Sequence, residues 1–457
     1  MILTLLGGGG FRVPLVYAAL LADHDPGRVS ELRLYDPDRR RLDVIAQVLA
    51  RQADTQQGRT GARDRVRVSV HTDLAQAVRG TDFIFSALRV GGLAGRVCDE
   101  RVALELNTIG QETVGAGGIS YALRTIPVAV RLAEQIRTNA PDAWVINFTN
   151  PAGMITETMA RTLGERVIGI CDSPVGLARR ALVALGLTGR DLIGSDEVQI
   201  GYAGLNHLGW LHTLTVDGED VLPRLIGDAA AVGSFEEGRL FGPDWLQTLG
   251  ALPNEYLHYY YFAREALAAD QRSTPRGAYL AEQQQRFYDL FDRPVADPLV
   301  AWERARMERE ETYMANNRLA SGDFERDPAD LQSGGYDQVA LAIMRAISRN
   351  APARLILNVP NRALLPELDH EAIVEVPCLV DQHGARALPN TGLPDHGRGL
   401  VVSVKQVERY TIEAATTGSA RAALLALAGH PLVDSVNIAR RLLDGYRAEF
   451  RELDYLH

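Results

Sequence analysis

The sequence begins with Ile2-Leu-Thr-Leu-Leu6, an apolar run of strand length that leads directly into Gly7-Gly-Gly-Gly10. A helix is expected from about Pro14, because proline fits the first turn of a helix. A second strand, Glu31–Tyr35, ends at Asp36. This order is typical of a dinucleotide-binding unit, in which the helix N-terminus binds a pyrophosphate and the carboxylate binds the adenosine ribose of NAD. The residues expected to bind NAD are Gly7, Gly8, Gly9, Gly10 and Asp36.

One position departs from the usual dinucleotide fingerprint. A strict G-x-G-x-x-G would place a glycine at position 12, where this chain has Arg12, and the interval to Asp36 is somewhat long. A glycine-rich turn after a first strand can also be purely structural. The combination of strand, glycines, helix, strand and acid nevertheless favours dinucleotide binding, and the acid favours NAD over NADP.

Further apolar runs continue the alternation of strands and amphipathic helices. The expected strands are Val66–Val70, Phe83–Ala87, Trp144–Phe148 and Val167–Ile170, and one expected helix runs from Ile119 to Thr138. Alternation of this kind predicts a parallel sheet with helices on both faces. The fold class is therefore α/β, with a Rossmann-like, doubly wound parallel sheet in the N-terminal part.

The pattern changes from about Val198, where short strands are followed by longer helices such as Arg276–Asp292 and Ser419–Ala428. We expect an NAD-binding Rossmann-like domain over residues 1–195 and an α+β catalytic domain over residues 196–457. No low-complexity linker separates them, and no internal repeat is recognisable. Because ligand sites commonly form between domains, we expect the two to share the active-site cleft.

The composition excludes several classes of function. The chain has 457 residues, 46% of them hydrophobic, and a formal net charge of −10 without a basic run, which argues against a nucleic acid or an anionic membrane as partner. Three scattered cysteines favour a reducing compartment over a disulfide framework. Neither a signal peptide nor an apolar run of membrane-spanning length is recognisable. We therefore expect a cytoplasmic protein that acts on small metabolites.

Polar side chains occur where predicted strands end. Cys171 and Asp172 follow the strand that ends at Ile170, and open α/β sheets bind their ligands at such ends. Asn150 follows the preceding strand, and His207 lies in the glycine-flanked stretch Gly204-Leu-Asn-His-Leu-Gly-Trp210. A buried cysteine is usually packing, and a histidine in a turn is often only hydrogen-bonded. Our hypothesis is that cysteine, histidine and asparagine converge on one metal ion.

The glycine-rich stretch Ser86–Glu100, beyond the fourth strand, is expected to form a loop, and it contains two arginines. The guanidinium groups of Arg89 and Arg96 suit recognition of phosphate or carboxylate. The alternative is that each forms an ion pair with Asp99 or Glu100.

Two other polar segments receive simpler interpretations. Gly110–Gly118 is interpreted as a loop that closes over the site, because it is too rich in glycine for core packing alone. The charged run Trp302–Thr312 is interpreted as a solvated helix face.

Taken together, these segments resemble glycoside hydrolase family 4, the NAD- and metal-dependent glycosidases, and in particular its 6-phospho-β-glucosidases. The resemblance extends over nearly the whole chain. The matching segments are Gly7–Gly10, Arg89–Glu100, Gly110–Thr113, Asn147–Pro151, Gly169–Asp172, Gly204–His207, Leu357–Asn361 and His430–Val433.

The resemblance implies a role for individual residues. Cys171 and His207 match the family's metal ligands, which usually hold manganese, and Asp172 matches its proton donor. Positions that match the family's substrate-binding residues are Arg96, Asn150 and Arg276.

The catalytic base of the family resembles Tyr256, in Asn254-Glu-Tyr-Leu-His-Tyr-Tyr-Tyr261. Tyr259, Tyr260 and Tyr261 are close competitors, and an aromatic cluster of this kind is more often core than catalytic. In addition, His258 stands where the family usually has arginine.

The resemblance also implies a reaction that departs from the two-carboxylate mechanism of most glycosidases. NAD would oxidise C3 of the sugar, a tyrosine would remove the C2 proton, and the group at C1 would be eliminated before water addition and re-reduction. The implied cofactors are NAD and Mn²⁺ or another divalent metal. The implied substrate is a small 6-phosphorylated β-glucoside, the implied partners include no nucleic acid and no membrane, and the implied assembly is a homodimer or homotetramer.

One departure from the family bears on the substrate. Members often have Gly-Gly-Gly-Ser followed by Tyr-Thr-Pro, and the serine helps to bind the 6-phosphate, whereas this chain has Gly10-Phe-Arg-Val-Pro14. Either Arg12 supplies a positive charge instead, or the enzyme accepts unphosphorylated sugars; α-linked glycosides are a further alternative. A lactate- or malate-type dehydrogenase would need a His/Asp relay that the chain does not clearly match. A sugar- or nucleotide-sensing protein would not need Cys171, Asp172 and His207 intact.

Overall fold

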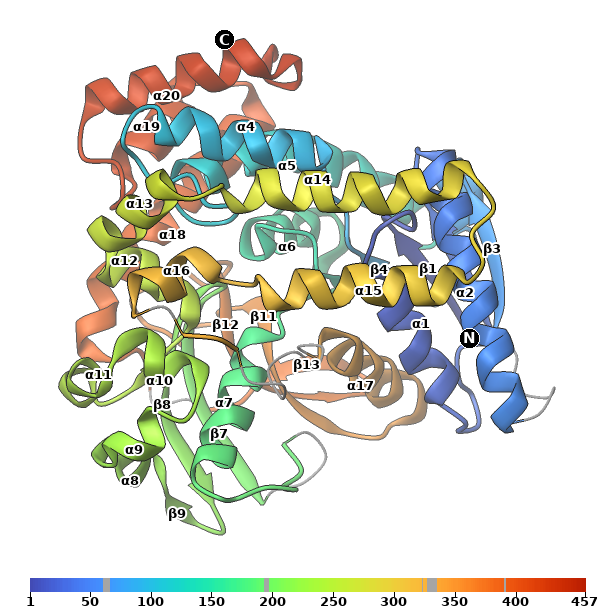
Figure 1. Ribbon diagram of the computed structural model, residues 1–457, viewed down its shortest axis with the longest axis horizontal. Coiled ribbons are helices and arrows are strands. Elements are labelled where there is room, and N and C mark those ends of the chain that lie inside the picture. The colour runs from blue at the N-terminus through green and yellow to red at the C-terminus, as the bar shows by residue number, and fades with distance from the viewer. Residues whose placement is uncertain (61–65, 193–196, 323, 327–334, 390–391) are drawn as a thin grey trace.

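The computed structural model describes residues 1–60, 66–192, 197–322, 324–326, 335–389 and 392–457. Within these residues the centre of the molecule is one sheet of thirteen strands (Figure 1). Six strands pair in parallel in the order β3-β2-β1-β4-β5-β6, which is the Rossmann arrangement. Their bounds are β1 Ile2–Leu6, β2 Glu31–Tyr35, β3 Arg67–His71, β4 Phe83–Ser86, β5 Trp144–Asn147 and β6 Val167–Ile170.

The C-terminal part of the chain extends this sheet instead of building a second one. Strand β11 (Ala353–Pro360) pairs antiparallel with β6, and the order then continues β12-β7-β8-β10. The bounds of these and the two remaining strands are β7 Val198–Leu205, β8 Leu208–Val216, β9 Glu219–Asp220, β10 Leu252–Pro253, β12 Ile373–Asp381 and β13 Gly384–Ala387. Backbone hydrogen bonds therefore run without a break from the parallel strands of the N-terminal part to the antiparallel strands of the C-terminal part.

Helices cover both faces of the sheet, because side chains along each buried strand alternate between the faces. Leu3 and Leu5 pack in one apolar cluster, whereas Ile84 and Val145 pack in another. The first face carries α1 Val13–Ala22, α2 Arg39–Thr60, α7 Ser173–Ala184 and α17 Tyr336–Arg349. The second carries α5 Gly115–Asn139, α6 Ala152–Leu163, α18 Asp395–Thr417, α19 Ala420–Gly429 and α20 Val436–Glu449.

Two long helices, α14 (Arg276–Asp289) and α15 (Pro298–Glu311), lie beyond the carboxyl ends of the parallel strands (Figure 1). Helix α14 packs on α4 (Gly92–Leu104), and α15 packs on α2. The remaining helices are α3 Leu74–Val78, α8 Leu222–Gly227, α9 Ala229–Val232, α10 Glu236–Phe241, α11 Pro243–Leu249, α12 His258–Tyr261, α13 Ala263–Arg272 and α16 Ala315–Ala320.

Most of the predicted elements are confirmed. Each predicted strand of the parallel sheet occurs with its bounds shifted by at most one residue. The α/β class, the Rossmann-like sheet and the α+β composition of the C-terminal part are as predicted. The predicted domain boundary, between residues 195 and 196, lies outside the described residues, so this division stays a prediction.

Two predicted loops are wrong in part, because their glycines serve helix packing. The segment Ser86–Glu100 is largely helix α4, and a Cβ on Gly95 would approach the buried Arg124 guanidinium within 3.2 Å. The segment Gly110–Gly118 enters α5 at Gly115, and its residues from 114 onward are buried. A Cβ on Gly117 would lie 2.4 Å from the Gly110 carbonyl oxygen, so this part is tightly packed and does not close over the site.

The glycine turn after β1 is fixed by side chains from the other end of the chain. The carbonyl groups of Gly9, Phe11 and Arg12 accept hydrogen bonds from the side chains of Tyr288, Trp302 and Tyr336, at 2.7, 2.8 and 3.0 Å respectively. Phe11 also packs edge-on against Phe287. The shape of this turn therefore depends on α14, α15 and α17.

None of the helices in the described part of the chain is both long and apolar enough to cross a membrane.

We expect Trp302→Phe to lower the free energy of unfolding by about 1–3 kcal/mol, because the Phe11 carbonyl would lose its buried donor. The measurement is urea unfolding followed by far-UV circular dichroism. Trp245→Phe is the matched control, since its buried indole N–H has no hydrogen-bond partner among the described residues. Equal destabilisation by the two substitutions would show that the hydrogen bond contributes nothing.

Candidate active site

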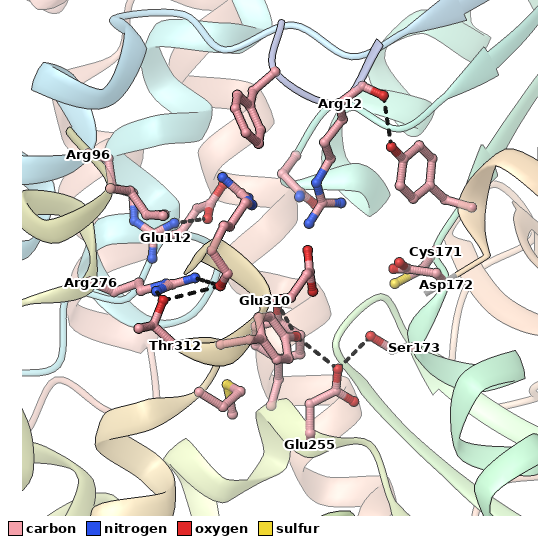
Figure 2. Close-up of a pocket in the computed structure, with 18 of the residues that line it drawn as sticks. Arg12, Arg96, Glu112, Cys171, Asp172, Ser173, Glu255, Arg276, Glu310 and Thr312 are labelled. Carbon is pink, nitrogen blue, oxygen red and sulfur yellow. Dashed lines mark hydrogen bonds and ion pairs between the residues drawn. The ribbon is translucent and has the colours of Figure 1, made fainter. Parts of the chain in front are cut away.

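The carboxyl ends of the central parallel strands open into a cavity of about 1110 Å³. Residues from Leu5 to Tyr336 contribute to its walls, so segments on both sides of the predicted domain boundary line one cavity. The predicted site residues that line it are Gly7, Gly10, Asp36, Arg96, Asn150, Cys171, Asp172, His207, Tyr256 and Arg276. In Figure 2, Cys171 and Asp172 lie on one side of the cavity, and Arg96, Glu112 and Arg276 lie on the opposite side.

Gly8 and Gly9 are the two predicted cofactor residues that do not line the cavity. A Cβ on Gly8 would lie 2.6 Å from the Cβ of Leu34, and a Cβ on Gly9 would lie 2.7 Å from that of Arg41. These glycines allow the turn to pack against β2 and α2. Gly7, by contrast, has a φ of 87°, a conformation that favours glycine.

Asp36 lies at the edge of the cavity, directly after β2. Its carboxylate accepts hydrogen bonds from the backbone N–H of Gly9 at 3.2 Å and of Asp38 at 3.0 Å. Burial raises the pKa of this carboxyl above its ordinary value. The position and the acceptor chemistry suit a ribose hydroxyl.

Cys171 follows β6, whose four residues are all buried, and is itself only 4% exposed. Burial raises the pKa of the thiol well above its ordinary value, and the nearby carboxylates of Glu375 and Asp172 raise it further. The thiol is therefore protonated in these surroundings. Only a bound cation would favour the thiolate.

His207 lies in the turn between β7 and β8 with a φ of 63°, in the left-handed region that histidine visits more readily than most residues. Its Nδ1 is 2.7 Å from the hydroxyl oxygen of Thr113. Burial lowers the pKa of the imidazole to about 4, so the ring is neutral at pH 7. Because Thr113 engages Nδ1, Nε2 is the nitrogen left for a metal ion.

The donor set of the cavity suits a divalent transition metal. A cysteine thiolate and a neutral imidazole are ligands for such metals, and hydroxyl oxygens of a sugar would suit manganese. Among the described residues, no group of three or more His, Cys, Asp or Glu side chains could hold a metal. The protein would therefore supply Cys171 and His207, and ligand oxygens would fill the other positions. Asn150 lines the same cavity.

Tyr256 stacks on the imidazole of His207, with ring centroids 3.8 Å apart and planes 9° from parallel. The hydroxyl of Tyr313 donates to the phenol oxygen of Tyr256 at 3.2 Å. Burial raises the pKa of Tyr256 above its ordinary value, and the neighbouring Glu255 raises it further. The phenol is therefore protonated unless a cation lies nearby.

The competing tyrosines occupy other surroundings. Tyr259 lines the cavity, whereas Tyr260 and Tyr261 do not. Tyr260 stacks with His430, and the hydroxyl of Tyr261 accepts a hydrogen bond from Trp210 at 2.9 Å. Tyr256 is thus the tyrosine of this cluster that contacts His207.

The predicted ion-pair alternative is confirmed for Arg96, whose Nε donates to Glu100 at 2.7 Å on α4. Arg89 pairs instead with Glu112, which also pairs with Arg96. Asp99 pairs with the buried Arg124. Glu100 and Glu112 therefore neutralise the two arginines of the predicted loop, Arg89 and Arg96.

Arg276 is held without a carboxylate partner among the described residues. Its guanidinium donates to the hydroxyl of Thr312 and, at 2.8 Å, to the carbonyl of Arg309. Both partners belong to the end of the charged run Trp302–Thr312. The interpretation of that run as a solvated face is wrong, because Arg309, Glu310 and Thr312 line the cavity.

Sequence reasoning missed Thr113, Glu112 and Arg309 as individual site residues. A signal for Arg309 was present, since it follows Trp302 by seven residues and Ala305 by four, spacings that place all three on one helix face. Trp302 and Ala305 are buried, so the same face carries Arg309 inward. The sequence gives no comparable signal for the contact between Thr113 and His207.

Two family models match most of the chain. The model described as family 4 glycosyl hydrolase matches residues 2–187, and the family 4 glycosyl hydrolase C-terminal domain matches residues 202–433. A probable 6-phospho-beta-glucosidase of Bacillus subtilis is 30% identical over 455 residues, which cover 96% of this chain and 94% of the relative. A maltose-6'-phosphate glucosidase of the same organism is 28% identical, with 97% and 94% covered.

Solved structures are similar over the same extent. The 6-phospho-beta glucosidase from Thermotoga maritima, solved with manganese, NAD+ and glucose-6-phosphate, has a TM-score of 0.80 at 26% identity and covers 100% of this chain and 99% of its own. A malate dehydrogenase from Plasmodium falciparum has a TM-score of 0.50 at 11% identity, covering 91% of this chain and 99% of its own. The latter similarity shows a shared fold alone.

The ion pairs of Glu112 predict a pH dependence of stability. Burial raises the pKa of Glu112, but Arg89 and Arg96 lower it much more, so it lies far below the ordinary value. The ionised form therefore stabilises the fold above a pH of about 4.3, and this contribution is lost progressively at lower pH. We expect Glu112→Gln to lower the free energy of unfolding by about 3 kcal/mol at pH 7 and by clearly less at pH 3.

Urea unfolding at both pH values measures this difference. Glu105→Gln, at the residue that follows α4, is the control, because its ion pair with Arg101 is exposed and should contribute about 0.5 kcal/mol or less. A loss for Glu112→Gln that is the same at pH 7 and pH 3 would contradict the expected linkage.

Proposed function

Because the chain belongs to the family 4 glycosyl hydrolases, we propose that it hydrolyses 6-phospho-β-glucosides with the help of bound NAD and a divalent metal. The observation that carries the proposal is the convergence of two sets of residues in one cavity. Gly7 and Asp36 line its dinucleotide end, and the acid–base and metal-binding candidates line the remainder. Those candidates are Cys171, Asp172, His207 and Tyr256.

The relatives support a phosphorylated glucoside as substrate. Those of Bacillus subtilis are named for a 6-phospho-beta-glucoside and for maltose 6'-phosphate, and the Thermotoga maritima structure holds glucose-6-phosphate. We choose the β-linkage because the 30% identical relative and the Thermotoga enzyme carry that name. The second candidate is a 6-phospho-α-glucoside, which the maltose-6'-phosphate relative favours.

The residues present fit both cofactors named in the Thermotoga structure. When bound, NAD⁺ would accept and return the hydride of sugar C3, and the metal would act as a Lewis acid on the oxidised sugar. Gly7, Gly10 and Asp36 would hold the dinucleotide. Cys171 and the Nε2 of His207 would hold the metal, and Asn150 would orient the sugar beside them.

Tyr256 would remove the proton from C2 of the sugar. A metal ion beside His207 would lower the pKa of the stacked phenol, which burial raises. The hydrogen bond from Tyr313 also favours the ionised form, because it is donated to the phenol oxygen. The base is thereby active only when the metal site is filled.

Asp172 would protonate the departing oxygen at C1. It directly follows Cys171 and immediately precedes α7, so the same turn would position the proton donor and a metal ligand. This arrangement would keep the leaving group on the β6 side of the sugar. Arg96 and Arg276, on the opposite wall, would contact the rest of the substrate (Figure 2).

The dehydrogenase alternative is not favoured. The likeness to malate dehydrogenase is confined to the fold, whereas the family models cover most of the chain. The cytoplasmic location and the homodimer or homotetramer expected from the sequence stay predictions.

The first experiment is cleavage of an aryl β-glucoside 6-phosphate under reducing conditions, with NAD⁺ or Mn²⁺ omitted in turn. We expect cleavage to require both, and Cys171→Ala to abolish it at ordinary Mn²⁺ concentrations because the metal loses its thiolate ligand. Product release is followed by absorbance of the phenol.

Three parallel substrates make this result decisive. Cleavage of the α-anomer alone would select the second candidate, and cleavage of the free glucoside alone would remove the phosphate from the proposal. Steady NADH formation from malate, without release of phenol from any glucoside, would refute it.

A matched pair of variants tests the base. We expect Tyr256→Phe to lower kcat by about 10²- to 10⁴-fold with little change in KM, as for loss of a general base. Tyr259→Phe removes a hydroxyl from the same cavity and should lower kcat less than tenfold. A larger effect at Tyr259 would transfer the role to that residue.

A further inference from the structure

Gln111 and Thr113 lie directly before α5 and form a chain of hydrogen bonds that ends on the imidazole of His207. We infer that these two side chains are positioning residues, which hold the ring proton of His207 on Nδ1 and thereby leave the lone pair of Nε2 to a metal ion. The inference rests on the proposed function, in which His207 is a metal ligand. It gives a physical role to two residues that the proposed reaction does not use.

The chain starts at Gln111, whose amide orientation is fixed by the backbone. The backbone N–H groups of Thr113 and Val114 both donate to the side-chain atom Oε1 of Gln111, at 2.7 and 3.0 Å. Because a backbone N–H can only donate, the atom that it contacts must be the oxygen of the amide and not its nitrogen. Gln111 is therefore a hydrogen-bond acceptor at this end.

The hydroxyl group of Thr113 lies between two groups that could accept its proton. Its Oγ1 is 3.1 Å from Oε1 of Gln111 and 2.7 Å from Nδ1 of His207. A hydroxyl has one proton to donate, and the amide oxygen has none. Both contacts are therefore hydrogen bonds only if Thr113 donates to Gln111 and accepts from the Nδ1–H of His207. With the ring proton on Nε2, one of the two contacts would bring two acceptors together.

The ring of His207 consequently presents Nε2 without a proton. Among the described residues, Nε2 has no hydrogen-bond partner, and His207 lines the same cavity as Cys171. A neutral histidine binds a divalent cation through such a lone pair, while its other nitrogen donates to an outer partner. Thr113 is that outer partner, and Gln111 determines that Thr113 accepts from the ring.

Two other buried histidines carry their proton on the opposite nitrogen. Nδ1 of His258 accepts from the amide Nδ2 of Asn317 at 2.8 Å, and Nδ1 of His430 accepts from the backbone N–H of Leu432 at 3.1 Å. Burial lowers the pKa of both rings to about 4, as it does for His207, so each ring is neutral and has its proton on Nε2. Burial alone therefore does not choose the tautomer, and the partner of Nδ1 does.

The segment that carries Gln111 and Thr113 is packed tightly against the first turn of α5. A Cβ on Gly117 would lie 2.6 Å from the carbonyl oxygen of Gln111, and a Cβ on Gly118 would lie 2.6 Å from the carbonyl carbon of Thr113. Only glycine permits so close an approach of two backbone segments. The glycine-rich stretch at the start of α5 thus fixes the hydroxyl of Thr113 against His207.

Tyr256 holds the same imidazole from another side. It stacks on the face of the His207 ring, with the centroids 3.8 Å apart, whereas Thr113 contacts the ring edge at Nδ1. Rotation of the imidazole would break one of these contacts. The direction of Nε2 is therefore fixed together with the position of the proton.

The first test is the tautomer of His207 in the full-length protein after removal of metal with EDTA. Long-range ¹⁵N–¹H NMR correlation of protein labelled with ¹⁵N in histidine distinguishes the ring nitrogen that carries the proton from the one with the lone pair. His207→Asn identifies the signals of this ring among the ten histidines. We expect the proton on Nδ1 at pH 7, in contrast to His258 and His430.

Thr113→Val retains the shape of the side chain but removes the hydroxyl. We expect the ring proton of His207 to move to Nε2, because Nδ1–H would lose its acceptor. Affinity for Mn²⁺, measured by calorimetry with saturating NAD⁺, should fall by about 10- to 100-fold, as for loss of the outer partner of a metal-binding histidine. Thr113→Ser keeps a hydroxyl and should restore the Nδ1–H tautomer and most of the affinity.

Thr125→Val is the matched control. Thr125 is a buried residue of α5 whose hydroxyl donates to the carbonyl of Tyr121 at 2.8 Å, and it does not line the cavity. The substitution removes a hydroxyl of the same kind and should change neither the tautomer of His207 nor the affinity for Mn²⁺. Equal weakening of Mn²⁺ binding by Thr113→Val and Thr125→Val would attribute the loss to packing and contradict the inference.

A pair of substitutions tests the contribution of Gln111. Gln111→Glu keeps an acceptor oxygen and should leave the ring proton on Nδ1. Gln111→Met removes the acceptor, so the hydroxyl of Thr113 becomes free to donate to His207 and the ring proton should move to Nε2. A proton that stays on Nδ1 in folded Gln111→Met would refute the role of Gln111.

The remaining outcomes separate this inference from the proposed reaction. A proton on Nε2 of His207 in the unsubstituted protein, or unchanged Mn²⁺ affinity in Thr113→Val, would overturn the inference whether or not a glycoside is cleaved. The expected tautomer and Mn²⁺ affinities without cleavage of any 6-phosphoglucoside would refute the reaction and leave the inference intact. Absence of Mn²⁺ binding by the unsubstituted protein would overturn both.

Discussion

The structure depends on the hydrogen bonds that hold the glycine turn after β1. Three helices of the C-terminal half, α14, α15 and α17, each supply an aromatic donor to a carbonyl of this turn. The turn belongs to the N-terminal Rossmann unit, yet its conformation is set by residues 279 to 324 positions later in the chain. The same contacts therefore shape the glycine turn and hold the helices that line the cavity beside it. Helices α14 and α15 also carry Arg276 and Arg309 into that cavity.

Burial determines the protonation state of the candidate catalytic groups. The thiol of Cys171 and the phenol of Tyr256 have raised pKa values, and the imidazole of His207 has a lowered one, because each charged form is poorly solvated. All three side chains are therefore neutral near pH 7. A single cation held between thiol and imidazole would reverse the balance for both the thiol and the phenol. In the proposed reaction, metal binding and activation of the base would be one event.

The charged residues of the cavity divide into two groups with different physical roles. Arg89 and Arg96 are compensated by Glu100 and Glu112. These ion pairs hold α4 and the segment that precedes α5 together at the cavity wall. Arg12 lies over two aromatic rings, and Arg276 donates to a hydroxyl and a carbonyl, contacts that fix the two side chains without an ion pair to a described residue.

The sequence by itself determined the parallel sheet. The length of each strand, its apolar composition and the glycine turn after the first strand are local properties, and burial of the apolar strands between helices then produces the sheet. It also indicated Cys171, Asp172 and Asn150, because residues that end neighbouring parallel strands must meet at one edge of the sheet. Only the tertiary structure decided which tyrosine stacks on His207, that Thr113 engages its Nδ1, and that Glu112 rather than Asp99 neutralises Arg89. It alone placed Arg309 in the cavity that Arg12 also lines. These contacts join segments about 50 to 300 residues apart in most cases, and their partners are chosen by the packing of whole helices, which no local pattern of residues encodes.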